Sequence, residues 1–98
     1  MRQLIERVHK WADNRGIFEK GTVYAQAEKT VEEAEELAEA VQFGDDDGIV
    51  DGIGDVMVTL IIQAKLQGLD IETCLESVLM EIENRKGTMV NGTFVKNV

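Results

Sequence analysis

The sequence predicts an all-α protein: a four-helix bundle unit followed by a short C-terminal β-hairpin. Apolar residues recur at helical spacing in four stretches, at about residues 2–14, 24–43, 49–67 and 71–86. Glycine or aspartate stands at each break between these stretches, where helices commonly begin or end. Asn91 and Gly92 lie between β-prone residues at about 88–96, which is a strong signal for a two-residue hairpin turn.

Length and composition limit the class of protein. A chain of 98 residues forms one domain with a thin core of its own. A formal net charge of −9 disfavours binding to nucleic acid or to an anionic membrane surface; it fits a cation site and equally fits simple solubility. The single cysteine, Cys74, excludes an intrachain disulfide and suits a reducing cytosol. We see no signal peptide and no membrane span, and expect a cytoplasmic protein.

The first two helices are predicted from their apolar residues. In the first, these are Leu4, Ile5, Val8, Trp11 and Ala12. Gly16 ends this helix, and residues 16–23 are expected to form a loop. In the second helix we expect the core to be a stripe of small apolar residues: Ala27, Val31, Ala34, Ala38 and Val41.

The third helix is apolar on most sides, which indicates burial from two directions. So short a chain has little protein with which to cover it twice, so we expect a partner subunit. The fourth helix follows Asp70, a good N-cap, and closes at Gly87. Its apolar face consists of Ile71, Leu75, Val78, Leu79 and Ile82.

Two short acidic motifs are candidates for a metal site. Glu33 and Glu36 form an E-x-x-E pair on the second helix, and Asp51 and Asp55 form a D-x-x-x-D pair on the third. Residues three or four apart share a helix face, and carboxylates on adjacent helices suit Mg²⁺ or Mn²⁺. The alternative is that the glutamates form a solvated helix face and the aspartates complement the dipole of a first helical turn.

Mg²⁺ in proteins commonly bridges carboxylates to the phosphates of a substrate. Such a substrate also needs cations from the protein, and the candidates are Lys29, Arg85 and Lys86. For Arg85 and Lys86, the alternative is that they only complement the dipole at a helix C-terminus.

Three segments carry a resemblance to a known family. They are Gln26-x-x-Lys29-x-x-Glu32-Glu33-x-x-Glu36-Leu37, Gly52-Ile53-Gly54-Asp55-Val56-Met57-Val58 and Arg85-Lys86-Gly87. Over nearly its whole length the chain resembles the MazG-like nucleotide pyrophosphohydrolases, especially their short, often phage-encoded members. The resemblance implies Mg²⁺-dependent conversion of (d)NTP to (d)NMP and pyrophosphate by a homodimer or homotetramer, in the cytoplasm of a bacterium or phage-infected host.

The resemblance also implies roles for individual residues. Glu33 and Glu36 match the first metal-binding pair and Asp55 the last acid of the second, so these three are the candidate catalytic residues. The other acid of the second pair is usually three residues before Asp55, where this chain has Gly52; Asp51 is the obvious substitute.

Three further residues bear on the candidate site. Glu32 is a candidate for a supporting acid or a base, and Trp11, which its spacing favours as a core residue, is a candidate for a base pocket. Glu81 stands near the position where many members carry a phosphate-binding lysine. This leaves Lys29, Arg85 and Lys86 to hold the phosphates.

Two other functions stay open. One is a non-catalytic, acidic helical module that binds a partner protein, which the glycine at position 52 and the glutamate at position 81 favour. The other is a related hydrolase acting on another nucleotide, such as an alarmone or phosphoribosyl-ATP. The preferred base and sugar are not marked by any pattern in the sequence.

Overall fold

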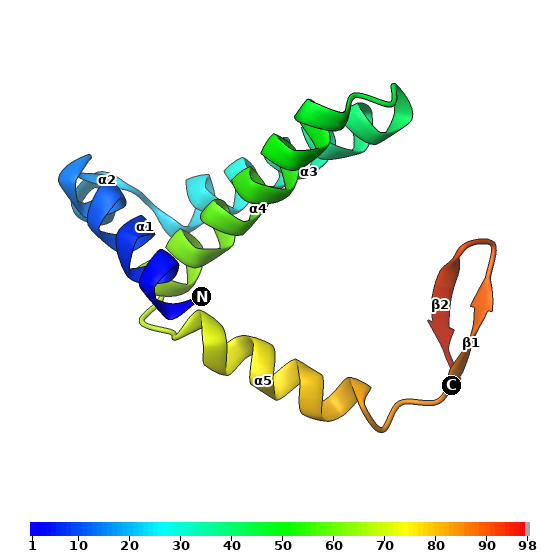
Figure 1. The fold of residues 1–98 in the computed structure, drawn as a ribbon. Coiled ribbons are helices and arrows are strands. Elements are labelled where there is room, and N and C mark those ends of the chain that lie inside the picture. The colour runs from blue at the N-terminus through cyan, green and yellow to red at the C-terminus, as the bar shows by residue number, and fades with distance from the viewer. Residues whose placement is uncertain (98) are drawn as a thin grey trace.

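The computed structural model of the chain, described here for residues 1–97, is mostly helical and ends in a β-hairpin (Figure 1). Its elements in chain order are α1 (Arg2–Asn14), α2 (Ile17–Lys20), α3 (Val23–Gln42), α4 (Asp46–Leu66), α5 (Ile71–Ile82), β1 (Gly87–Val90) and β2 (Thr93–Lys96). The predicted all-α class with a terminal hairpin is therefore confirmed. None of the helices in the described residues is long and apolar enough to cross a membrane.

Side-chain caps fix where the long helices begin. The Thr22 hydroxyl accepts a hydrogen bond from the Ala25 amide at 3.1 Å, at the start of α3. The Asp45 carboxylate accepts one from the Gly48 amide at 3.0 Å, and so α4 begins at Asp46, three residues before the predicted start. The Asp70 carboxylate accepts one from the Glu72 amide at 2.9 Å and begins α5.

Two further predicted boundaries differ from the structure. Residues 17–20, expected to lie in a loop, form the short helix α2 after Gly16 reverses the chain at a φ of 75°. The helix α5 ends at Ile82 and not near residue 86, because the chain turns there and the Arg85 amide bonds to the Ile82 carbonyl at 3.0 Å. The following residues are thus free to join the hairpin, whose turn has positive φ at both Asn91 and Gly92.

The helices α3 and α4 form an antiparallel pair that projects from the rest of the fold (Figure 1). Two side-chain amides bind these helices together: Gln26 donates to the Thr59 carbonyl at 3.0 Å, and Gln63 donates to the Val23 carbonyl at 3.3 Å. At Gly52 the helices come so close that an added Cβ would lie 3.1 Å from the Leu37 Cα. Glycine at this position therefore sets the separation of the pair.

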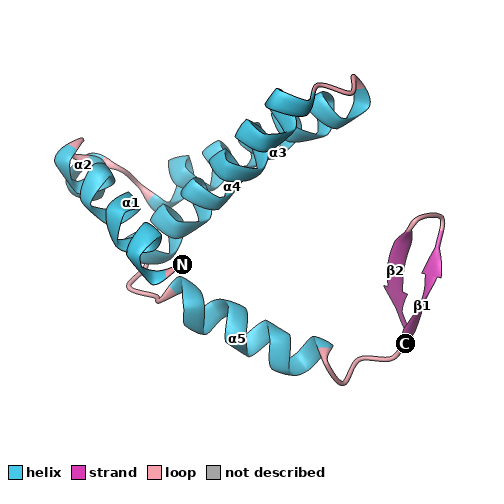
Figure 2. Ribbon diagram, in the orientation of Figure 1, coloured by secondary structure: helices cyan, strands magenta, loops and turns pink. Residues whose placement is uncertain are grey.

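The apolar core lies where α1 packs on the C-terminal half of α4 (Figure 2). Its buried apolar residues are Ile5, Ala12, Ile61, Ile62 and Ala64. This core is small, as expected for a short chain.

The predicted core stripe of α3 is not buried within the chain. Val31 and Val41 are 57% and 58% exposed, and the small residues between them are also exposed. The face of α3 that packs on α4 is instead the neighbouring flank, which includes Gln26, Glu33 and Leu37. This part of the prediction is wrong, because polar side chains on that flank bond across the helix pair while the apolar stripe faces away.

The helix α5 and the hairpin, residues 71–97, form a C-terminal arm that leaves the α1–α4 junction and extends away from it (Figure 1). No hydrogen bond or ion pair within residues 1–97 joins the hairpin to a helix. The apolar face of α5 is exposed, with Leu75 at 68% and Val78 at 50%. The arm therefore does not complete a closed bundle with its own chain.

The chain is more extended, and exposes more surface, than a compact domain of its length. The radius of gyration is 15.7 Å, whereas a compact chain of this length has a value of about 12.6 Å. The accessible surface is 7769 Å² for a chain of 10.9 kDa, whereas a compact monomer of this mass exposes about 5,600 Å². One chain thus exposes about 2,200 Å² more than a self-contained domain.

The close approach at Gly52 gives a matched test within one helix. Gly52→Ala should destabilise the protein, because the new methyl meets the Leu37 backbone, and overpacking costs about 1–3 kcal/mol. Gly54→Ala meets nothing within 4 Å and should stabilise the protein by up to about 1 kcal/mol through helix propensity. Chemical denaturation measures both; equal stabilisation by the two changes would contradict the close packing of α3 on α4.

Candidate active site

Three carboxylates gather on α3. Oxygen atoms of Glu32, Glu33 and Glu36 lie within 4.8 Å of one another, and we call this group the glutamate cluster. Glu33 is 8% exposed and lies on the flank of α3 that packs on α4, whereas Glu32 and Glu36 are exposed. One buried and two accessible carboxylates at this spacing form an oxygen donor set that is open to solvent.

The buried charge of Glu33 has a cationic partner one turn earlier. The Lys29 Nζ lies 3.1 Å from a Glu33 carboxylate oxygen and 3.6 Å from one of Glu32. The hydrogen bond to Glu33, followed by the charge of Glu32, raises the pKa of the Lys29 ammonium. Burial of a carboxylate is tolerated when it is paired in this way, so Lys29 compensates the burial of Glu33.

The pKa of Glu36 shifts in the opposite direction to that of a carboxylate paired with a cation. A side-chain hydrogen bond with Glu33, then the negative charge of Glu33, raises the pKa of the Glu36 carboxyl. The charge of Lys29 acts against this shift and only partly offsets it. The cluster therefore holds more negative charge than its one lysine neutralises.

Beside the cluster, α3 and α4 enclose a groove of about 510 Å³, which we call the acidic groove. Both predicted aspartates of α4, Asp51 and Asp55, line it together with Glu36 from α3. Asp51 and Asp55 lie outside the 4.8 Å glutamate cluster. The structure thus brings the two predicted pairs to one side of the helix pair, with Glu36 common to the cluster and the groove.

The geometry accounts for the glycine at position 52. Gly52 lines the groove but is buried against Leu37, so an added Cβ would lie 3.0–3.1 Å from Leu37 and would require that residue to shift. Asp51 reaches the groove from the adjacent position without entering the α3–α4 interface. An acid at position 51 therefore fits this helix packing without a shift of Leu37, whereas a side chain at position 52 would require one.

Three acidic or aromatic residues of the groove were not predicted from the sequence. Glu39 lines the groove beside Glu36, as do Asp45 and Phe43 from the turn between α3 and α4. Their positions in the sequence could have identified them. Glu39 is one turn after Glu36, and the turn residues must lie at the end of the same helix pair. The Asp45 carboxylate also caps α4 by accepting a hydrogen bond from the Gly48 amide.

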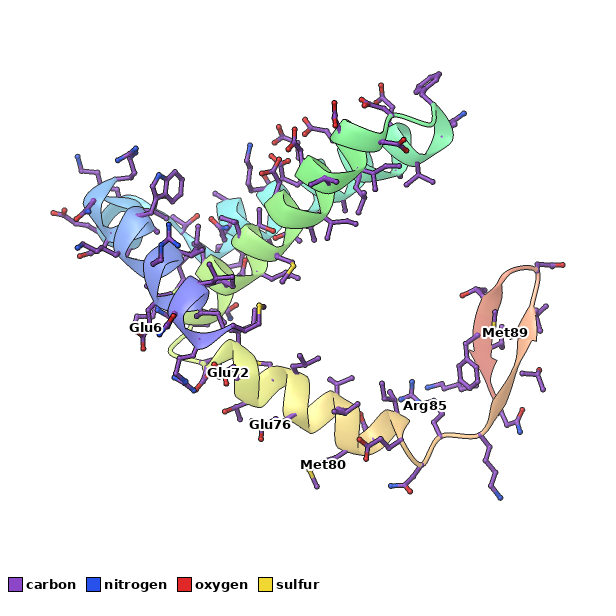
Figure 3. All side chains as sticks on the ribbon, viewed as in Figure 1. Glu6, Glu72, Glu76, Met80, Arg85 and Met89 are labelled. Atoms are coloured by element: carbon purple, nitrogen blue, oxygen red, sulfur yellow. The ribbon has the colours of Figure 1, made fainter. Side chains whose placement is uncertain are left out.

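The predicted phosphate-binding residues are not together in one chain. Lys29 pairs with the glutamate cluster, but Arg85 and Lys86 follow α5, and Figure 3 shows Arg85 near the C-terminal end of that helix, before the hairpin. Trp11 of α1 is 47% exposed and stacks under the Arg15 guanidinium, 5.4 Å from the ring centroid. It is therefore neither fully in the core, as its spacing suggested, nor part of the acidic groove.

The chemistry of this donor set is that of a hard divalent cation. Carboxylate oxygens are the ligands that Mg²⁺ and Mn²⁺ prefer, and the cluster and groove supply them from two helices held at a fixed separation. The groove is also within the size range of small-molecule clefts, roughly 300–1,000 Å³. The arrangement can hold a cation next to space for a ligand.

Comparison with known proteins identifies the family. A 37% identical relative in Haemophilus phage HP1, an uncharacterized 18.2 kDa protein in the rep-hol intergenic region, matches over 70 residues; these are 71% of this chain and 43% of the relative. No solved structure matches the chain significantly. The model of the MazG nucleotide pyrophosphohydrolase domain matches residues 22–90, which include α3, α4, α5 and the whole glutamate cluster. These residues make up more than half of the chain, and the chain therefore belongs to the MazG nucleotide pyrophosphohydrolase domain family.

Proposed function

We propose that this protein is a Mg²⁺-dependent nucleoside triphosphate pyrophosphohydrolase, which converts (d)NTP to (d)NMP and pyrophosphate. The observation that carries the proposal is the glutamate cluster beside the acidic groove, within the segment matched by the MazG domain. Family membership supports hydrolysis of a nucleotide, and the carboxylate donors support a hard divalent cation.

In this proposal Glu33, Glu36 and Asp55, with Asp51, hold the metal. Mg²⁺, when bound, neutralises phosphate charge and polarises the phosphorus centre. Lys29, which pairs with Glu33 in the metal-free chain, would supply one positive charge to a phosphate oxygen of the substrate. The close α3–α4 packing holds these groups in register.

Glu32 is the proposed base. It is exposed, and its carboxylate lies within 4.8 Å of the other two glutamates. It would take a proton from the attacking water as the water oxygen bonds to the α-phosphorus and the bond to the β-phosphate oxygen breaks. The products are the monophosphate and pyrophosphate, and Glu32 returns its proton to solvent.

We expect Glu36→Gln and Asp55→Asn each to lower turnover by more than about 100-fold, since even residues that only orient metal ligands cost 10–100-fold when changed. The assay incubates a panel of ribo- and deoxynucleoside triphosphates with Mg²⁺ or Mn²⁺ and resolves the products by ion-exchange chromatography. Glu35→Gln, which changes an acid outside the glutamate cluster, is the matched control and should retain activity.

The products of the same assay separate the alternatives. Diphosphate with orthophosphate would show a different phosphohydrolase. No product from any nucleoside triphosphate, followed by turnover of an alarmone or phosphoribosyl-ATP, would identify a related hydrolase. Absence of both turnover and Mn²⁺ binding by calorimetry would favour the non-catalytic interaction module.

The raised pKa of Glu36 gives a test on stability. The folded metal-free chain binds this proton more tightly than the unfolded chain, so the contribution of Glu36 to stability is present at low pH. It is lost as the pH rises through the raised pKa of Glu36. Glu36→Gln should therefore gain thermal stability relative to wild type at neutral pH, and lose the further increase that Mn²⁺ gives to wild type.

Thermal melts at about pH 4 and about pH 7, each with and without Mn²⁺, check this expectation. Glu35→Gln serves again as the control and should behave as wild type in all four conditions. A Glu36→Gln protein that is less stable than wild type without metal, and is still stabilised by Mn²⁺, would remove Glu36 from the metal site.

We also propose that the active form is a homodimer or homotetramer. One chain exposes about 2,200 Å² beyond a compact monomer, and two chains burying this excess would form an interface of about 4,400 Å², in the range of obligate homodimers. The exposed apolar faces lie on three elements: Val50, Ile53, Met57 and Leu60 of α4, Leu75, Val78, Leu79 and Ile82 of α5, and Val31 and Val41 of α3.

Light scattering coupled to size-exclusion chromatography should give two or four times the 10.9 kDa mass of one chain. Val78→Asp, which places a charge on the exposed apolar face of α5, should shift the protein towards smaller species or unfold it. Glu76→Gln, on the other side of α5 (Figure 3), should leave the mass unchanged. A wild-type mass of one chain would exclude the assembly.

A further inference from the structure

Opposite charges are segregated along this chain. Residues 28–55 contain eleven acidic residues and one lysine, whereas residues 85–97 contain Arg85, Lys86 and Lys96 and no acidic residue. In space the first segment forms the glutamate cluster and the acidic groove, and the second forms the end of the C-terminal arm (Figure 3). The chain thus carries a strongly acidic site and a basic segment on two separate projections.

A nucleotide site needs positive charge that the acidic groove lacks. Among the described residues that line the groove, the charged ones are all acids: Glu36, Glu39, Asp45, Asp51 and Asp55. The nearby Lys29, which pairs with both Glu33 and Glu32, supplies at most one positive charge. A triphosphate chain entering this groove would meet an excess of negative charge that bound cations offset only in part, so further cations must come from elsewhere.

The arm cannot bring those cations to its own groove from the position it occupies. Where it leaves the body it is fixed by the Leu69 amide bonded to the Ala64 carbonyl at 2.8 Å, and by Arg2 paired with Glu72 at 3.3 Å. From that base α5 runs away from the α3–α4 pair, and the hairpin lies beyond its far end (Figure 1). A second copy of the chain can receive the basic segment without any change in this geometry.

The arm also has the surface of an element that packs on another chain. Its apolar side chains are exposed on α5 and on the hairpin, where Met89 is 66% and Phe94 51% exposed. At its base an apolar cavity of about 550 Å³ lies between α1, α4 and α5, unfilled by the chain's own side chains. Together with the excess surface of one chain, these features favour a second copy as the occupant.

We infer that the basic segment of one copy, Arg85, Lys86 and Lys96, completes the acidic groove of a second copy and supplies the cations that bind the substrate phosphates there. This inference rests on the proposed nucleotide pyrophosphohydrolase function. Charge complementarity between residues 85–97 and residues 28–55 guides the pairing, and the apolar faces of the arm stabilise it.

The inference is tested by complementation between two inactive chains. One chain carries Asp55→Asn, and the other carries Arg85→Ala with Lys86→Ala. Coexpression with two different tags and purification on both isolates the mixed dimer. In that dimer one groove has intact acids facing an intact arm from the other copy, so activity should return to about half of wild type.

If each arm served its own groove, both grooves of the mixed dimer would be defective and activity would stay at the level of the single variants. That result, with an active wild-type protein, would overturn the inference and leave the proposed function intact. A mixed dimer of Asp55→Asn and Glu36→Gln, both changed in the acids, is the control and should remain inactive.

A second readout does not depend on activity. Unlabelled and heavy-isotope-labelled wild-type chains are mixed by joint refolding and treated with a carbodiimide, which joins lysine ammonium groups to carboxylates in contact. Mass spectrometry should find Lys86 or Lys96 joined to acids of residues 32–55 in peptide pairs of mixed isotope content. Links from these lysines only within one chain, or only to acids outside that segment, would overturn the inference even if no nucleotide were hydrolysed.

Discussion

The close packing of α3 on α4 is the constraint on which the site depends. The contact of Gly52 with Leu37 lets the two helices approach, and this approach buries Glu33 on the flank of α3 that faces α4. It also places Glu36 of one helix and Asp55 of the other along a single groove. The absence of a side chain at position 52 therefore removes one possible acid ligand and, by the same geometry, brings the remaining acids together.

The charges at this site do not favour the stability of the free chain. Within residues 1–97, Lys29 is the only basic residue that pairs with the glutamate cluster, and a hydrogen bond with Glu33, then the negative charge of Glu33, raises the pKa of Glu36. A protein selected only for stability would spread such charges apart, since like charges on neighbouring helical positions are unfavourable. The repulsion that weakens the free protein is the same free energy that a divalent cation would release on binding.

The sequence predicts the elements of this fold better than it predicts which faces meet. Caps and turns depend on a few adjacent residues, so Asp70 and the Asn91–Gly92 turn could be located from the sequence. Helical periodicity identifies the stripes of α3, but it does not show which neighbour covers each stripe. The flank with Gln26 packs on α4 because its amide bonds to the Thr59 carbonyl, and the apolar stripe with Val31 is left exposed. Periodicity identified a buried stripe correctly only where that stripe packs within the same chain.

The same limit explains why one chain describes only part of the proposed site. Arg85 and Lys86 could be selected from the sequence as phosphate ligands by their charge, but their own chain places them far from the acids. The basic segment and the acidic groove lie on separate projections of one chain (Figure 1), so the groove has no basic residue from the C-terminal arm of the same chain. In the proposed arrangement, substrate binding then depends on assembly. The apolar faces whose contact drives association also bring the basic segment of one copy to the acids of another.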